Sequence, residues 1–132
     1  MPDTTDPPQP QPIEFVRHEN FESWHANNIQ FYPSEWDLKL VFGELDWPKG
    51  GNVVVQQHTA MTLSWLQAKI FQYFLTLNLA LYEMQHGKIK VPAAVMPPEA
   101  QPPTGDLAND PAALKFYEFV KATREQFVEA LK

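Results

Sequence analysis

Residues 64–87, SWLQAKIFQYFLTLNLALYEMQHG, constrain the fold of this chain more than any other stretch. Ser64 and Gln67 have the spacing of a capping box, in which each side chain accepts a hydrogen bond from the other residue's backbone N–H. Gly87 suits the left-handed position that closes a helix. A helix in a small protein usually buries one apolar stripe. This one is apolar over more of its circumference, which indicates two partners and favours assembly over catalysis.

Two apolar stripes run along this predicted helix. The first has three- and four-residue spacing and is predicted to pack on a sheet: Ala68, Phe71, Leu75, Leu79 and Tyr82. The second, called here the outer stripe, consists of Ile70, Phe74, Leu77 and Leu81. Monomers rarely expose an apolar patch of several hundred Å². Burying four such side chains contributes on the order of 6–12 kcal/mol before entropy, so the outer stripe is expected to be covered.

The residues before the helix favour β-structure. Apolar and polar residues alternate over 36–42, which is the period of a half-buried strand. Similar patterns predict strands over 24–31 and 53–63, with turn signals at Pro33-Ser34-Glu35 and across 43–52. The expected fold class is therefore α+β, with a three-stranded antiparallel sheet packed by one long helix, plus a C-terminal helix on a Pro-rich tether.

Proline placement divides the chain into four segments. We expect a Pro-rich tail over 1–12, a β-β-β-α core domain over 13–89, a Pro-rich linker over 90–110 and a C-terminal helix over 111–132. Asp110 and Pro111 are a cap and a first-turn proline, which fix the start of that helix. Its apolar stripe comprises Leu114, Tyr117, Val120, Phe127 and Leu131, and is widened by Phe116 and Phe119.

Two ways of covering the outer stripe remain open. The C-terminal helix can fold back onto it within one chain, or another molecule can bind it. The open edges of a thin three-stranded sheet also invite pairing. The predicted interface residues are Ile70, Phe74, Leu77, Leu81, Phe116, Tyr117, Phe119 and Phe127. We expect a homo-oligomer, with a dimer as the first candidate, or a subunit docked into a larger protein complex.

Composition argues against several function classes. The 132 residues carry a formal net charge of −6 and their basic residues are scattered, which disfavours direct binding to nucleic acid. Polar residues interrupt the apolar helix, so no membrane span is expected. The chain has no cysteine, and its four histidines, His18, His25, His58 and His86, are dispersed. His25 and His58 can meet on neighbouring strands, but two histidines fall short of a zinc ligand set.

No motif names a reaction. Asp37 follows a turn and is expected to accept hydrogen bonds there, while Ser64 is predicted to serve as a cap. Gly50-Gly51 precedes a strand rather than a helix N-terminus, so it does not form a phosphate-binding loop. We therefore predict no catalytic, cofactor-binding or metal-binding residues, and no enzymatic activity.

Several short motifs resemble a family of small bacterial proteins known as domain of unknown function 3467. The similar segments lie between about residues 24 and 89: Ala26-Asn27-Asn28-Ile29, the run from Trp36 to Gly43, the run from Ser64 to Lys69, Tyr82-Glu83 and Gly87-Lys88-Ile89. The resemblance implies a strand–strand–strand–helix plan, a cytoplasmic location and no enzyme-type site.

The chain departs from this family in two places. The resemblance implies a charged outer helix face, whereas the outer stripe is apolar here. It also implies an end soon after the helix, whereas this chain continues into a linker and a second helix. Together these features predict a non-enzymatic interaction module, an accessory or homo-oligomeric subunit of a bacterial cytoplasmic assembly. The alternative is a small-molecule-binding module whose apolar pocket is lined by Trp24, Phe31, Tyr32, Trp36 and Trp47.

Overall fold

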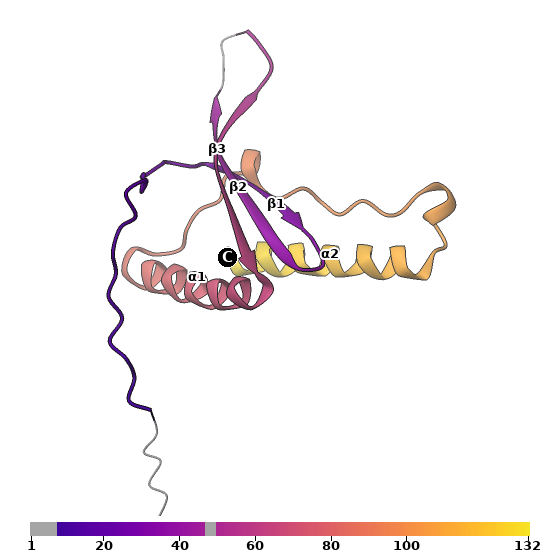
Figure 1. Cartoon of the computed structure of the whole chain (residues 1–132). Helices are drawn as coiled ribbons and strands as arrows, with labels where there is room; N and C mark the ends of the chain where they lie inside the picture. The colour runs from indigo at the N-terminus through magenta and orange to yellow at the C-terminus, as the bar shows by residue number, and fades with distance from the viewer. Residues whose placement is uncertain (1–7, 47–49) are drawn as a thin grey trace, which may run out of the picture. The chain divides into compact units, whose positions relative to one another are not determined.

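The computed structural model describes residues 8–46 and 50–132. Its elements are β1 (Asn28–Pro33), β2 (Asp37–Asp46), β3 (Val54–Ser64), α1 (Trp65–His86) and α2 (Pro111–Ala130), with two short 3₁₀ turns at Ala93–Val95 and Gly105–Leu107 (Figure 1). The predicted α+β class is confirmed: a three-stranded antiparallel sheet, a long helix after it and a C-terminal helix after a linker. Residues 1–7 of the predicted tail, and Trp47, lie outside the described residues.

Internal contacts divide the chain into two compact units, one ending at Leu66 and the other running from Gln67 to Lys132. The first contains the sheet and the second contains nearly all of α1, the connection and α2. Each unit is described by itself below. The packing of α1 on the sheet, and the four-segment division made from proline placement, stay predictions.

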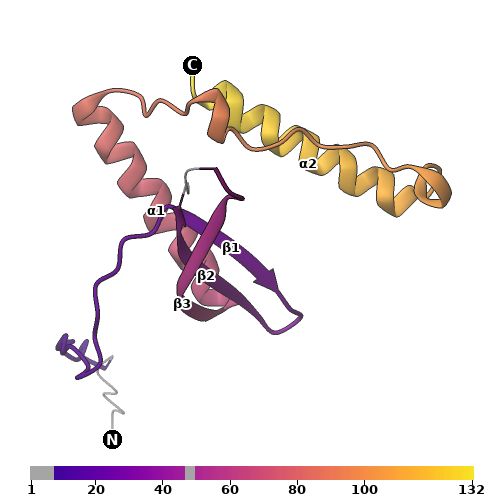
Figure 2. The same cartoon turned by 90° about the horizontal axis from the view of Figure 1, so that it is seen from above.

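The sheet has the order β1-β2-β3, with β2 in the middle (Figure 2). Leu38, Leu40 and Phe42 share one face of β2, since side chains alternate along a strand. Across the ladder these three residues lie opposite Leu63, Met61 and Thr59 of β3. Among the described residues Leu40 is the one buried hydrophobic residue, with 4% of its surface exposed.

A β-bulge interrupts the ladder between β2 and β3. Phe42 lies opposite Thr59 but Gly43 lies opposite Gln57, so His58 is an extra residue on β3. A Cβ at Gly43 would lie 2.8 Å from the carbonyl oxygen of Gln56, which explains the glycine. The sequence predicted a loop from residue 43 onwards. That prediction is wrong for residues 43–46, because β2 continues through Gly43 to Asp46.

The first strand begins later than the predicted residue 24. β1 starts at Asn28, and the preceding residue joins the ladder partly through its side chain. Asn27 donates its backbone N–H to Gly43 O at 3.1 Å, and its side-chain oxygen accepts from Leu45 N at 2.6 Å. A side-chain oxygen replaces a backbone acceptor here, an interaction that strand periodicity does not reveal.

The turn between β1 and β2 is held by Ser34. Its hydroxyl donates to the Asp37 carboxylate at 2.9 Å and accepts from the backbone N–H of Asp37 at 3.0 Å. Asp37 therefore accepts hydrogen bonds at the turn as expected: its carboxylate accepts from the Ser34 hydroxyl, and its backbone carbonyl accepts from Ser34 N at 2.8 Å. The indole N–H of Trp65 donates to Ser34 O at 3.1 Å, which ties the first residue of α1 to this turn.

Helix α1 has the predicted bounds and its predicted 22 residues. Gly87 adopts φ of 87° and donates to Glu83 O at 2.8 Å, so the left-handed closure is confirmed. The Glu83 carboxylate then accepts from Ile89 N at 3.1 Å, which secures the chain just beyond the helix. None of the described helices is long and apolar enough to cross a membrane.

Helix α2 begins as predicted, because the Asp110 carboxylate accepts from Ala112 N at 3.0 Å and Pro111 occupies the first turn. The connection between the helices runs back along α2 (Figures 1 and 2). The residues of α2 that are half-buried recur at three- and four-residue steps: Ala113, Tyr117, Val120, Arg124 and Val128. This stripe differs from the predicted one, since Leu114 and Phe127 are exposed.

Candidate interaction surface

The outer stripe of α1 is exposed along its length. Ile70, Leu77 and Leu81 are each more than two-fifths exposed, and Phe74 is 52% exposed. The Tyr73 ring meets Phe74 edge-on, with 5.2 Å between ring centroids. Next to it, Lys69, Ile70, Gln72, Tyr73 and Thr76 line a shallow hollow on the helix surface. The stripe therefore presents a ridge of apolar side chains beside a shallow depression.

The α2 residues of the predicted interface divide into two groups. Phe116 and Phe119 are exposed, at 69% and 68% of their surfaces. Tyr117 instead turns towards the connection, where it lines a cavity of about 240 Å³ with Pro103 and Leu107. Neighbouring residues on one helix thus serve different partners: Tyr117 packs within the chain, and Phe116 remains accessible.

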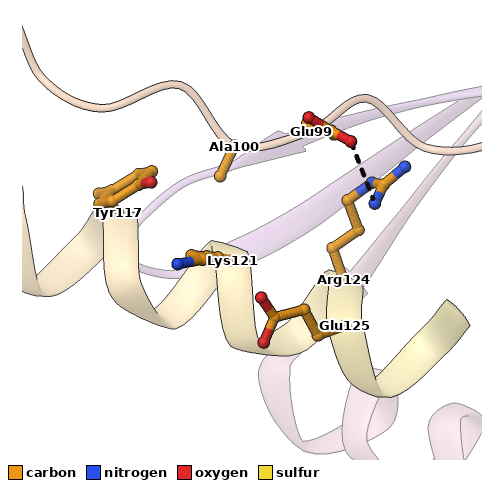
Figure 3. A pocket seen from close by; sticks show the side chains of 6 residues that line it. All are labelled: Glu99, Ala100, Tyr117, Lys121, Arg124 and Glu125. Carbon is orange, nitrogen blue, oxygen red and sulfur yellow. Dashed lines mark ion pairs between the residues drawn. The ribbon is translucent and has the colours of Figure 1, made fainter. Parts of the chain in front are cut away.

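A polar clasp holds the connection on α2, and it consists of Arg124, Pro97 and Glu99. The Arg124 guanidinium donates from Nε to Pro97 O at 2.8 Å and lies 4.0 Å from the Glu99 carboxylate. Figure 3 shows Arg124 reaching from the helix to the connection, where the dashed line marks its ion pair with Glu99. The Arg124 side chain is only a quarter exposed, so the bond to Pro97 is partly shielded from water.

The cavity beside this clasp contains several polar groups. It measures about 220 Å³ and is lined by Glu99, Ala100, Tyr117, Lys121, Arg124 and Glu125 (Figure 3). Of these residues, Arg124 bonds to the connection, through Pro97 O and the Glu99 carboxylate.

Helix α2 reaches α1 at a different face from the outer stripe. Phe127, Ala130 and Leu131 line a cavity of about 520 Å³ together with Thr76, Leu79, Ala80 and Glu83 of α1 and with Lys88, Ile89 and Val91 beyond it. The Lys88 ammonium donates to Ala130 O at 3.3 Å. Phe127, one of the eight predicted interface residues, lines this cavity. The outer-stripe residues do not line this cavity.

The sheet carries a second cluster, at the bulged residue of β3. The His58 ring stacks on Trp24 at 4.8 Å between centroids and lies 2.9 Å through Nε2 from His25 O. His58 Nδ1 is 2.8 Å from the Thr59 hydroxyl. His25 and His58 therefore do meet, through a backbone carbonyl and not as a pair of metal ligands. In the described ranges no three metal-ligating side chains gather at one place.

The aromatic residues proposed for a small-molecule pocket are largely exposed. Trp24, Phe31, Tyr32 and Trp36 each expose more than half of their surface. The described cavity of the sheet unit is a polar one of about 250 Å³, lined by Glu44, Leu45, Asp46 and Gln56. Whether these aromatic residues line a pocket between the sheet and the helix stays a prediction.

Three of the features above were missed by sequence reasoning. The half-buried stripe of α2 includes an arginine, so a search for apolar spacing passes over it. The Asn27 side chain and the His58 bulge depend on pairing between strands that are distant in sequence. A glycine inside an otherwise alternating strand was a usable signal for the bulge, because such glycines often mark bulges or close backbone approaches.

Comparison with known proteins gives one match. A family model described as "Protein of unknown function (DUF3467)" matches residues 2–91. Neither the curated proteins nor the solved structures contain a significant match. The matched range covers the strands and α1 and ends at the start of the connection, so α2 lies outside it.

Proposed function

The chain belongs to the DUF3467 family of proteins of unknown function, and from that premise we propose that it is a non-enzymatic protein-interaction module. In this proposal it acts as a homo-oligomeric or accessory subunit of a larger assembly in the bacterial cytoplasm. One observation carries the proposal: α1 exposes large apolar residues around its circumference, and Ala68 and Glu83 are its half-buried residues.

The area involved suits a stable interface. About ten apolar side chains of α1 are exposed by roughly half, which corresponds to on the order of 1,000 Å² of side-chain surface. A specific interface typically buries about 800 Å² on each partner. Some of this surface is predicted to meet the sheet, while the outer stripe and the exposed phenylalanines of α2 supply the remainder.

The test is the native mass of the full chain by light scattering over a dilution series. We expect an oligomer that Leu77→Glu dissociates, because a carboxylate buried in an apolar interface without a partner is costly. Gln72→Glu is the matched control: it adds the same charge to the same exposed helix, outside the outer stripe. A monomer at every concentration, with no protein retained when the tagged chain is recovered from its own cells, contradicts the proposal.

A binding role for a small molecule is the second candidate. The cavity of about 520 Å³ between α1 and α2 favours it over the aromatic pocket, since its lining is mostly apolar and it has the volume of a ligand site. Glu83 and Lys88 are its charged residues, and they lie 3.8 Å apart. Substituting Ala80→Leu fills this cavity. Retention of a co-purifying molecule by the original chain, and its loss in the variant, would support this second role.

A further inference from the structure

We propose that two copies of this chain pair through their β3 edges, residues 59–63 of one copy running antiparallel to the same residues of the other, with each N-terminal arm lying on the partner's sheet. The arm is defined as residues 13–23. This inference rests on the proposed self-association and adds to it a second contact between copies, separate from the outer stripe of α1.

The two edges of the sheet differ in how they are protected. β1 has six residues and ends in Pro33, which has no N–H to offer to a further strand. β3 has eleven residues, VVQQHTAMTLS, with no proline and no Asp, Glu, Lys or Arg. Proteins commonly guard sheet edges with short strands, prolines, charges or bulges. In the described part of the chain β3 pairs with β2 alone.

The one protective feature of β3 lies towards its start. The bulge at His58 interrupts the ladder, but the register from Thr59 to Ser64 is regular against β2. Residues 59–63 therefore keep a regular edge of backbone donors and acceptors. Because this edge carries no charge, two copies can approach along it without local repulsion, although each chain has a net charge of −6.

The path of the N-terminal segment points to the same edge. Asn27 bonds to β2, while Trp24 stacks on His58 of β3. Followed backwards from β1, the chain thus crosses β2 and reaches β3. Figure 1 shows the segment approaching the sheet from the β3 side. The arm therefore continues beyond the β3 edge, where the sheet of a paired copy lies.

The arm has the composition of a docking segment. Ile13 and Val16 are about four-fifths exposed and Phe15 is 92% exposed. Its local order comes from a turn in which Phe21 N donates to His18 O at 2.9 Å and the Arg17 guanidinium lies over the Phe21 ring. Apolar side chains of the arm expose on the order of 500 Å². Together with the β3 edge this approaches the roughly 800 Å² per partner of a stable dimer.

The experiment uses the absence of cysteine from the chain. Single cysteines are introduced at 59, 60, 61, 62 and 63, with Gln30→Cys on β1 as the control. A two-fold axis brings one residue to about 4.5–5.5 Å from its own copy, within the Cα distance that a disulfide spans. We expect oxidation to link one of these variants at least about tenfold faster than Gln30→Cys, with a steep fall on both sides.

A matched pair of charges provides the second measurement. Gln30 on β1 and Ala60 on β3 both pair with Val41 of the central strand β2, and both are exposed. We expect Ala60→Lys to raise the dissociation constant of the dimer about tenfold and Gln30→Lys to change it less than about twofold. Phe15→Ala is expected to weaken the dimer by a similar factor, with Glu14→Ala as its control.

The outcomes separate this inference from the proposed function. Suppose that the chain oligomerises, that no β3 cysteine cross-links preferentially, and that Ala60→Lys and Gln30→Lys have equal effects. Pairing through the β3 edge is then overturned, while self-association stands. A β3 cross-link without any effect of Phe15→Ala overturns the arm contact alone. A monomer in light scattering removes both proposals. A heavier complex that forms only with a protein from the cell, and no cross-link between copies, assigns the edge to another partner.

Discussion

The two helices have similar lengths, 22 residues for α1 and 20 for α2, but the chain covers their side chains to different extents. Helix α2 has a regular half-buried stripe, and the chain covers that stripe with its own Pro-rich connection. Helix α1 exposes apolar side chains on several faces. Proline thus contributes more than spacing here, because the extended connection acts as a packing partner for α2. Within the described unit from Gln67 to Lys132, no such segment covers the outer stripe of α1.

The largest expected effect is on α1. Phe74→Ala is predicted to weaken self-association by about 2 kcal/mol or more, a factor of about thirty in the dissociation constant, because central aromatic residues dominate interface energetics. Sedimentation over a dilution series measures it, and Gln72→Ala serves as the control. A dissociation constant within about twofold of the original would mean that the apolar side chains of α1, like those of the α2 stripe, do not need a partner molecule to cover them.

Adjacent residues on α2 sharpen the contrast further. Tyr117→Ala is expected to lower the free energy of unfolding of the helical unit by about 1.5–2.5 kcal/mol, half the usual cost for a fully buried aromatic residue. Phe116→Ala is expected to leave that stability within about 0.5 kcal/mol. Urea denaturation followed by circular dichroism distinguishes them. The comparison fails if Phe116→Ala destabilises the unit as much as Tyr117→Ala does.

The smallest expected effect concerns the clasp. Arg124→Ala removes the bond to Pro97 O, and the expected loss is about 1 kcal/mol for one partly shielded hydrogen bond. The Glu99 side chain is four-fifths exposed, so Glu99→Gln is expected to cost less than about 0.5 kcal/mol. Urea denaturation followed by circular dichroism measures both losses against the original chain. Equal free energies of unfolding for the original chain and Arg124→Ala would show that packing alone holds the connection on α2.

Helix ends were predictable because their signals are local. Gly87 adopts the left-handed conformation, and Asp110 and Pro111 begin α2, all within one turn of the residues concerned. Strand limits were less accurate. β1 starts four residues later than predicted, and β2 runs four residues further, because Asn27 and Gly43 take part in cross-strand contacts that one strand's periodicity does not encode.

The sequence predicted which residues belong to the candidate surface, but not which of them face solvent and which pack against the connection. The outer stripe and Phe116 and Phe119 are exposed, and their role in an interface stays a prediction. Tyr117 has the same apolar character as its neighbours, yet it faces the connection. Whether α2 or another molecule covers the outer stripe cannot be read from helix spacing either, since spacing defines a face without specifying what packs against it.

The sequence by itself determined the element types, the helix ends and the presence of two apolar stripes on α1. These follow from backbone caps, turn residues and side-chain period, which act over a few residues. Only the tertiary structure decided that α2 packs on its own linker, that His58 bulges from β3 and that Leu40 is the buried hydrophobic residue of the described sheet. Those outcomes depend on the contacts made when segments distant in sequence meet, and no local pattern specifies them.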